Sequence, residues 1–480
     1  MRKRNVVGSA GVAAVASVLA LSLLWWPEPL RAVTPSLYTD AVLPAQVAAQ
    51  LTPAGERGIV RSRPIALDTT SLPDPGTRPQ LAREPTLLLQ LFPDVAIAAV
   101  FDRFDPNPTG VTWVGHVEGQ TGSAVTMVYG NGLLSASIIT RSGTYQIRPA
   151  TEALRAANPQ PRGEVHIVAE LDQSALPREA EPVVPEIPAD ALEAAADQTA
   201  ADTADVIDVM FVYTPAAQQH AGGPTGMANL MALSIADTNT TYINSGIAQR
   251  VRLVHTALVN YTEVSSFGTN LSSLRLGVGG LSGVAALRDQ YGADLVMMLI
   301  HPSSPSACGI GYLMSSISTA FAPFGYSVTD TNCMSPNLTV AHEFGHNMGA
   351  HHDWYVTTAT QPFTYAHGYA NAEPGQRWRT VMSYNDKCAA QGFNCTRLLA
   401  WSNPDYQFNP FCTGGGFVCN NRLWHLPGRP MGIAGGTRST CTLGSLTNND
   451  CDADNRRTLN NTALTVANLR SAVVPLARRQ

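Results

Sequence analysis

The chain has 480 residues, of which 14% are charged, and its formal net charge is -5 at pH 7. This length allows two or more domains that each bury a sizeable core. The composition provides no basic field that would attract nucleic acid.

The first 32 residues have the pattern of an export signal. Arg2, Lys3 and Arg4 precede an apolar stretch from Val6 to Trp26,. An apolar stretch of about 20 residues can also span a bilayer, so an uncleaved membrane anchor is the alternative. We favour a cleaved signal, which predicts a secreted protein, extracellular or periplasmic, that contacts a membrane only if this segment stays attached.

Residues 33–171 change character along their length. The part up to residue 85 is rich in Pro, Ala and Arg without periodicity, which predicts an irregular lead-in. Residues 86–170 predict a small antiparallel β unit, because short β-prone runs alternate with turn signals such as Asn131-Gly132. These runs are Val111–Val117, Ala124–Tyr129, Leu133–Ile139 and Thr144–Ile147.

Residues 172–204 form an acidic segment rich in Ala and Pro, without aromatic residues. This composition cannot bury a core and therefore predicts a linker. An exposed linker is also a preferred site of proteolytic cleavage.

Residues 205–480 alternate strand and helix patterns. Their βαβαβ order before a further helix predicts an α/β (α+β) domain with a mostly parallel sheet. Ser335-Pro336 predicts the start of that further helix, with Ser as N-cap. The expected elements are strand 206–213, helix 226–244, strand 250–259, helix 283–291, strand 294–300, an edge strand at 309–314 and a closing helix at 459–476.

The run from His342 to Asp353 matches H-E-x-x-H-x-x-G-x-x-H-D at every specified position,. Because His342 and His346 are four residues apart, they share one face of a helix and can bind one cation. Gly349 can turn the chain so that His352 returns to the same metal. Three nitrogen ligands leave the fourth position of a tetrahedral Zn²⁺ open for water, which is typical of catalytic sites. Glu343 can accept the proton of that water.

The segment Thr380-Val381-Met382-Ser383-Tyr384 lies about 30 residues downstream, where metzincin proteases place their Met-turn,. On these residues, positions 205–475 resemble a metzincin, nearest to the reprolysin-like group and, among bacterial forms, to peptidyl-Asp metalloendopeptidases. Asp353 after the third histidine is typical of reprolysins. Tyr384 instead matches the position of the zinc-contacting tyrosine of astacins and serralysins. The sequence mixes two subfamily patterns and does not decide whether Tyr384 contacts the metal.

This resemblance implies that His342, His346 and His352 are the zinc ligands and that Glu343 is the catalytic base. It implies a zinc-binding active-site helix, with Asp353 as a buried structural carboxylate. Residues 33–171 would be a propeptide, residues 172–204 a linker and residues 205–480 the catalytic domain. The expected protein is a secreted zinc-dependent endopeptidase, made as a zymogen, that hydrolyses peptide bonds by Glu-assisted attack of a zinc-bound water.

Two alternatives remain for the function. One is a catalytically inactive, zinc-containing adhesion or binding module, and the other is a toxin-like protease for one dedicated partner. The expected partners are protein or peptide substrates, and the sequence predicts no oligomeric state. Selectivity for an acidic substrate residue would need a cation, for which Arg379, Arg397 and Arg422 are candidates, although surface arginines are the simpler interpretation.

Latency cannot use a propeptide cysteine on the metal, because residues 1–307 contain no cysteine. The block would instead be steric. Either the β unit covers the cleft, or a strand or the linker pairs with the edge strand, with Asp172 or His166 near the metal.

All eight cysteines lie in the second half of the chain, and an even number in an exported protein predicts disulfides,. Our hypothesis is sequential pairing that starts with Cys308 to Cys333 and Cys388 to Cys395.

Overall fold

The computed structural model describes residues 37–47, 57–68, 86–107, 110–160, 163–196, 201–374, 377–408, 429–436, 441–447 and 451–473. The predicted export segment, residues 1–32, lies outside these ranges. Among the residues that are described, no helix is both long enough and apolar enough to cross a membrane.

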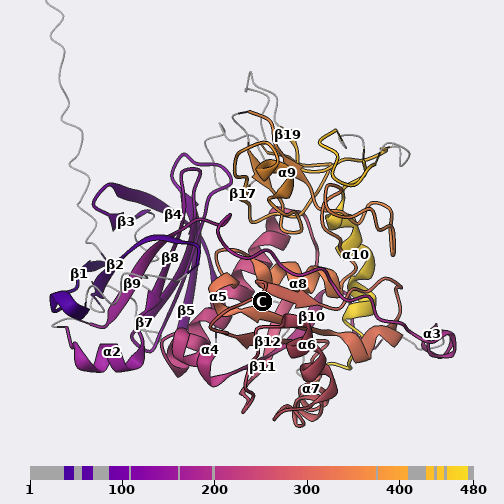
Figure 1. Ribbon diagram of the computed structural model, residues 1–480, viewed down its shortest axis with the longest axis horizontal. Coiled ribbons are helices and arrows are strands. Elements are labelled where there is room, and N and C mark those ends of the chain that lie inside the picture. The colour runs from indigo at the N-terminus through magenta and orange to yellow at the C-terminus, as the bar shows by residue number, and fades with distance from the viewer. Residues whose placement is uncertain are drawn as a thin grey trace, which may run out of the picture. The chain divides into compact units, whose positions relative to one another are not determined.

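The amino-terminal part of the described chain forms a nine-stranded antiparallel sheet (Figure 1). The strand order is β1-β2-β9-β8-β7-β6-β5-β4-β3, so most strands pair with their neighbours in sequence. The strands are β1 (Tyr38–Asp40), β2 (Ile59–Leu67), β3 (Thr86–Phe92), β4 (Val95–Asn107), β5 (Gly110–Val117), β6 (Ala124–Gly130), β7 (Leu133–Ile139), β8 (Thr144–Pro149) and β9 (Val165–Leu171).

A row of cross-strand neighbours gives this sheet its core. Trp113, Met127, Ala136, Ile147 and Val168 lie opposite one another on successive strands from β5 to β9. All five are buried in the same apolar cluster. Because side chains alternate between the faces of a strand, this row places every second residue in the core.

The β unit is larger than the sequence predicts, and the irregular lead-in is wrong for two segments. Strands β1 and β2 come from residues 33–85, and β2 pairs with β9 about a hundred residues later,. Ile65 and Leu67 are fully buried, whereas Arg61 of the same strand binds Glu170 of β9 at 2.5 Å. Charged residues on the outer face hide the apolar alternation, and only pairing with β9 completes the strand.

The carboxy-terminal part contains a five-stranded sheet in the order β11-β10-β12-β14-β13. Strands β11 and β12 flank β10 in parallel, and β14 is parallel to β12. Strand β13 is antiparallel to β14 and lies at the edge. The strands are β10 (Val206–Tyr213), β11 (Arg250–Leu258), β12 (Leu295–Ile300), β13 (Gly309–Gly311) and β14 (Tyr326–Asp330).

Helix α5 (Pro224–Asn244) contacts both sheets, packing on β6 and β7 of the first and on β11 of the second. This position explains its weak amphipathicity, because a helix that is covered on several sides has no single apolar face. Its polar residues therefore find internal partners. The Asn229 side chain, for example, donates to the carbonyl of Leu133 in β7 at 2.9 Å.

The remaining elements are shorter. The closing helix starts earlier than predicted because Asp454 caps it, accepting a hydrogen bond from the Arg457 amide at 2.9 Å,. The helices are α2 (Glu152–Ala157), α3 (Ala189–Ala196), α4 (Pro215–His220), α6 (Phe267–Leu276), α7 (Val284–Tyr291), α8 (Thr339–Asn347), α9 (Asp386–Ala389) and α10 (Asn455–Val466), with 3₁₀ turns at Thr319–Phe324 and Thr331–Cys333. Two-residue strands are β15 (Ala370–Asn371), β16 (Trp378–Arg379), β17 (Thr396–Arg397), β18 (Gln407–Phe408) and β19 (Arg429–Pro430).

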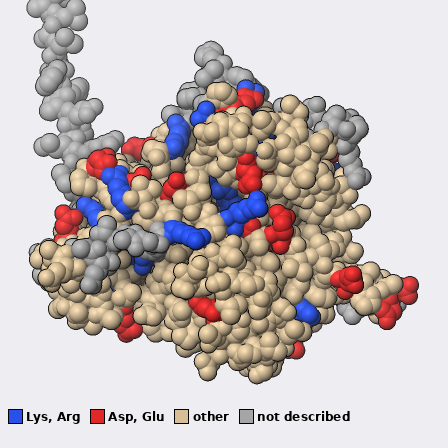
Figure 2. Space-filling model, viewed as in Figure 1, with Lys and Arg blue, Asp and Glu red and all other residues tan. Residues whose placement is uncertain are grey.

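Disulfides link neighbouring cysteines along the chain. The predicted pairs Cys308–Cys333 and Cys388–Cys395 are confirmed, and Cys441 pairs with Cys451. Cys412 and Cys419 lie outside the described residues. Charged side chains of both signs are sparse and interspersed on the face shown in Figure 2.

One buried acid lies where helix α5 packs on the first sheet. Asp237 of α5 is buried near the hydroxyl groups of Thr126 in β6, Ser137 in β7 and Ser335. Burial raises its pKa from 3.8 to about 6, although those hydroxyls and Arg103 oppose the shift. The folded chain therefore binds this proton more tightly than the unfolded chain does.

This shift makes stability depend on pH. The stability tied to the protonated form is full below the ordinary pKa of 3.8 and is lost as pH rises through about 6,. The shift corresponds to about 3 kcal/mol. We expect Asp237→Asn to raise the thermal midpoint of the intact chain at about pH 7.5 but to change it little at about pH 4, measured by scanning calorimetry. An equal effect at both pH values would contradict this.

Candidate metal centre and active-site cleft

Helix α8 carries the histidine motif but begins later than predicted. It starts at Thr339, and the Asn337 side chain donates to the Thr339 hydroxyl at 3.1 Å. Leu338 has a left-handed backbone with φ 63°, which interrupts the helical path after Pro336,. Ser335 therefore cannot cap the helix, and that prediction is wrong.

The structure brings three imidazoles of the motif together in a buried cluster. The Nε2 atom of His352 lies 3.2 Å from Nε2 of His342 and 3.0 Å from Nε2 of His346. Gly349 makes this possible with φ +85°, and a Cβ there would lie 2.8 Å from Pro362,. The three residues form a group that could hold a metal ion.

Backbone carbonyls set the tautomers of two of these histidines. The Nδ1 atom of His342 lies 2.9 Å from the Val381 carbonyl, and Nδ1 of His346 lies 2.8 Å from the Ala350 carbonyl. A carbonyl can only accept, so each Nδ1 carries the proton and each Nε2 presents a lone pair. Burial lowers the pKa of His342 to about 3 and that of His346 well below its usual range, which keeps both rings neutral. Lone pairs that converge without protons fit a cation.

Glu343 lies beside this cluster as a buried carboxylate without a hydrogen-bond partner among the described residues. Burial and the nearby Glu179 charge raise its pKa well above the ordinary value. Its carboxylate packs against β13, where a Cβ on Gly309 would lie 2.5 Å from Oε1 and one on Gly311 would lie 3.2 Å from Oε2. Glycines at both positions make room for it, and sequence reasoning missed this role.

The Met-turn supports α8 from below. Met382 is fully buried, and a Cβ on Gly345 would lie 2.7 Å from its sulfur and 2.8 Å from the Trp401 ring. Gly345 therefore lets the helix approach the turn closely. Asp353 is buried as predicted and accepts hydrogen bonds from the amides of Tyr355 and Tyr384, both at 3.0 Å.

Tyr384 packs against the histidine cluster. Its ring centroid lies 4.1 Å from that of His352, and its hydroxyl donates to the carbonyl of Glu179 at 2.6 Å. In this structure the hydroxyl is therefore engaged by the segment that precedes α3.

That segment, residues 173–184, runs past the edge of the five-stranded sheet before the chain reaches α3 (Figure 1). Its backbone pairs with residues 308–313 at the edge of the five-stranded sheet, which is the pairing of linker and edge strand that the sequence predicts as one form of the block. The Ala180 amide donates to the Gly309 carbonyl at 2.8 Å, and the Val183 amide donates to the Gly311 carbonyl at 3.0 Å. In the opposite direction, the Leu313 amide donates to the Val183 carbonyl at 2.9 Å.

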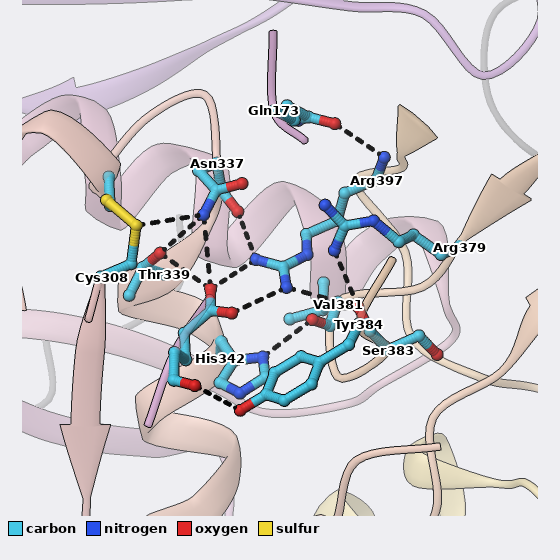
Figure 3. Close-up of polar contacts among 12 residues, drawn as sticks. Gln173, Cys308, Asn337, Thr339, His342, Arg379, Val381, Ser383, Tyr384 and Arg397 are labelled. Atoms are coloured by element: carbon cyan, nitrogen blue, oxygen red, sulfur yellow. Dashed lines mark hydrogen bonds and ion pairs between the residues drawn. A yellow bond between two sulfur atoms is a disulfide. The ribbon is translucent and has the colours of Figure 1, made fainter. Parts of the chain in front are cut away.

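A buried ion pair anchors the segment (Figure 3). Arg397 donates to the two carboxylate oxygens of Glu179 at 2.6 and 3.0 Å, and both side chains are 1% exposed. The Thr339 hydroxyl also donates to Glu179, at 3.0 Å. Burial alone would raise the pKa of Glu179, but the Arg397 charge outweighs it and holds this pKa below its ordinary value.

A second arginine lies next to this pair. The Arg379 guanidinium is buried and donates to the Ser383 carbonyl at 2.8 Å (Figure 3). A pocket of about 400 Å³ is lined by residues that include Glu179, Arg379 and Arg397. The interpretation of these two arginines as surface residues is thus wrong. Arg422 lies outside the described residues.

Other predicted residues lie elsewhere. His351 is adjacent to the cluster but stacks on His367, with ring centroids 5.5 Å apart. His166 is buried in the first sheet and accepts from the Leu134 amide at 3.0 Å, and Asp172 accepts from the Ser174 amide at 2.8 Å. The acid that reaches the cluster is Glu181, with Oε2 3.4 Å from Nδ1 of His352. Composition alone did not single it out among the acids of residues 172–204.

A buried group of three histidines, two of them on one helix and the third returned by a turn, lies beside a carboxylate and an edge strand, which is the arrangement of a metallopeptidase. Residues 203–395 match the model of metallo-peptidase family M12. The chain belongs to this family and is a metalloendopeptidase of the metzincin type.

Curated relatives extend the similarity beyond that region. A peptidyl-Asp metalloendopeptidase of Stenotrophomonas maltophilia strain R551-3 is 31% identical over 361 residues, covering 73% of this chain and 71% of the relative. The protein of that name from strain K279a is 32% identical, covering 63% and 68%. The one from Xanthomonas campestris pv. campestris is 31% identical, covering 65% and 72%. Among solved structures, metalloproteinase-II from Bacteroides fragilis has a TM-score of 0.35, a likeness too distant to define shared details.

The cluster geometry predicts which histidines hold the metal. We expect His342→Ala, His346→Ala and His352→Ala each to lose bound metal, because each removes one of three convergent nitrogens. His351→Ala is the matched control and should keep it. Metal per chain, measured by plasma emission spectrometry after dialysis, tests this. Loss of metal in His351→Ala but not in His352→Ala would show that the third ligand is misassigned.

Proposed function

We propose that the metal is Zn²⁺ and that the chain is a secreted, zinc-dependent endopeptidase made as a zymogen. The observation that carries the proposal is the convergence of three buried imidazoles beside a buried carboxylate with no described partner. Three nitrogen ligands with an open fourth position are what catalytic zinc sites use. Zn²⁺, when bound, supplies a Lewis acid that polarises a peptide carbonyl and lowers the pKa of bound water to about 7.

Residues of the chain transfer the proton and align the substrate. Glu343 takes the proton of the attacking water and returns it to the leaving amine, since no other described group competes for its oxygens,. The Gly309 and Gly311 carbonyls and the Leu313 amide align an extended substrate by main-chain hydrogen bonds, as they now align residues 180–183,. Tyr384, whose hydroxyl already donates to a peptide carbonyl, can orient a substrate carbonyl.

Export and selectivity belong to the same proposal. The segment at residues 1–32 supports secretion, as do the disulfides, which persist in oxidising compartments,. The relatives are named for peptidyl-Asp cleavage, and we extend to this chain a preference for acidic residues.

The proposed latency is steric. Residues 33–171 act as a propeptide, and residues 173–184 block the cleft by occupying the edge that a substrate needs. Residues 185–196 are exposed or half-buried, so residues 185–204 are the proposed region of activating cleavage,.

The assignment of the base predicts the effect of one substitution. Glu343→Gln keeps the size of the side chain, but its amide cannot accept the proton of the water. We expect a loss of at least about 100-fold in kcat on a fluorogenic peptide, with metal content and thermal midpoint close to wild type. Turnover near the wild-type value in this variant would remove Glu343 from the mechanism.

The block of the cleft predicts a backbone-specific effect. Val183→Pro removes the amide that donates to Gly311, whereas Val183→Ala keeps it and serves as the control,. One lost hydrogen bond of about 1 kcal/mol should raise the residual activity of the uncut chain about fivefold in Val183→Pro alone. Activity is measured on a fluorogenic peptide, with chain integrity checked by mass spectrometry. Equal residual activity in wild type and both variants would argue against this block.

A further inference from the structure

We propose that Arg397 is the residue that selects an acidic side chain in the substrate, and that Glu179 fills its pocket in the intact chain as a substitute for that side chain. This inference rests on the proposed function, because it assigns the selectivity of the same cleft.

The pocket is a built anion site. Arg397 and Glu179 meet through two parallel hydrogen bonds of 2.6 and 3.0 Å, the fork geometry in which guanidinium matches carboxylate,. The Thr339 hydroxyl adds a third donor to the same carboxylate at 3.0 Å. Arg397 comes from β17 and Thr339 from the first turn of α8, so two separate elements converge on one carboxylate.

The remaining partners of Arg397 do not neutralise its charge. They are the carbonyl oxygens of Asn337, at 2.8 Å, and Ser383, at 3.3 Å (Figure 3). The neighbouring Arg379 adds positive charge to the same region, although Asp353 and Asp386 act on it electrostatically. When residues 173–184 leave, the Arg397 guanidinium keeps only these neutral partners, and the pocket then favours an anionic side chain over a neutral one,.

The position of the pocket ties it to the reaction. Glu179 immediately precedes Ala180, which pairs with Gly309 on the strand that borders Glu343. Its own carbonyl accepts from Tyr384, whose ring packs on His352. A side chain that starts from this stretch of backbone therefore enters the pocket beside the histidine cluster. A substrate lying on the same edge would place one of its side chains there.

The test exchanges the charges of the pair. The full-length chain with both Glu179→Arg and Arg397→Glu keeps a buried ion pair, which protects folding. After limited proteolysis of residues 185–204, kcat/KM is measured on peptides that carry Glu, Asp, Gln or Lys at one position. Wild type should favour Glu or Asp over Gln by on the order of 100-fold or more, and the exchanged variant should favour Lys. Retained acidic preference in the exchanged variant would overturn the proposal.

A neutral pair covers the case in which the exchanged chain does not fold. Glu179→Gln with Arg397→Gln should cleave Glu and Gln peptides at rates within about threefold of each other, because no fixed charge separates them. Arg377→Glu reverses an exposed cation in the same region and is the matched control, which should keep the wild-type ratio. Equal ratios in the neutral pair and wild type would also overturn the proposal.

A binding measurement separates this inference from the proposed function. The protein for this measurement is the metal-loaded, proteolysed Glu343→Gln variant. Calorimetry should show that it binds a Glu-containing peptide at least about tenfold more tightly than the Gln analogue. Adding Arg397→Gln to this variant should abolish the difference. Cleavage of all peptides without acidic preference, together with equal binding, defeats only the role of Arg397. Preferential binding without cleavage by any activated chain defeats the endopeptidase assignment and leaves the pocket intact.

Discussion

The burial of helix α8 is the constraint on which the active-site cleft depends. All nine of its residues are buried, so each polar side chain that it carries needs a partner inside the protein. His342 and His346 each donate from Nδ1 to a backbone carbonyl, and their Nε2 atoms converge. The Glu343 carboxylate packs against two glycines and lies near the Glu179 charge. An unpaired buried carboxylate is costly, and the arrangement therefore fits a cation and its bound water as missing partners.

The same strand edge connects the proposed latency to the proposed substrate binding. Residues 173–184 use the main-chain groups and the arginine pocket that a substrate would need, so one surface accounts for both the block and the proposed selectivity. Departure of the segment would leave the Arg397 charge without its carboxylate, which favours the segment staying in place while the chain is intact,. The ion pair also explains how a segment whose only buried apolar side chain is Leu176 can be ordered.

Sequence reasoning succeeded where the signal is local. Strands β5, β6, β7 and β10 and the return of His352 follow from alternation, turn residues and motif spacing. It failed where the deciding partner is distant. Strand β2 needs β9, and the start of α8 depends on the backbone of Leu338. Glu179 is one of several acids in its segment, and nothing nearby distinguishes it from Glu181.

The sequence by itself determined which side chains could bind a metal, because helix periodicity and one glycine turn bring together residues within ten positions of each other. It also indicated the disulfide pairs, since neighbouring cysteines close short loops. Only the tertiary structure decided that the acidic segment lies in the cleft and that Arg397 faces Glu179, 218 positions away. Burial is the physical reason for this pairing, because a carboxylate and a guanidinium bind strongly only where the fold has excluded water from both.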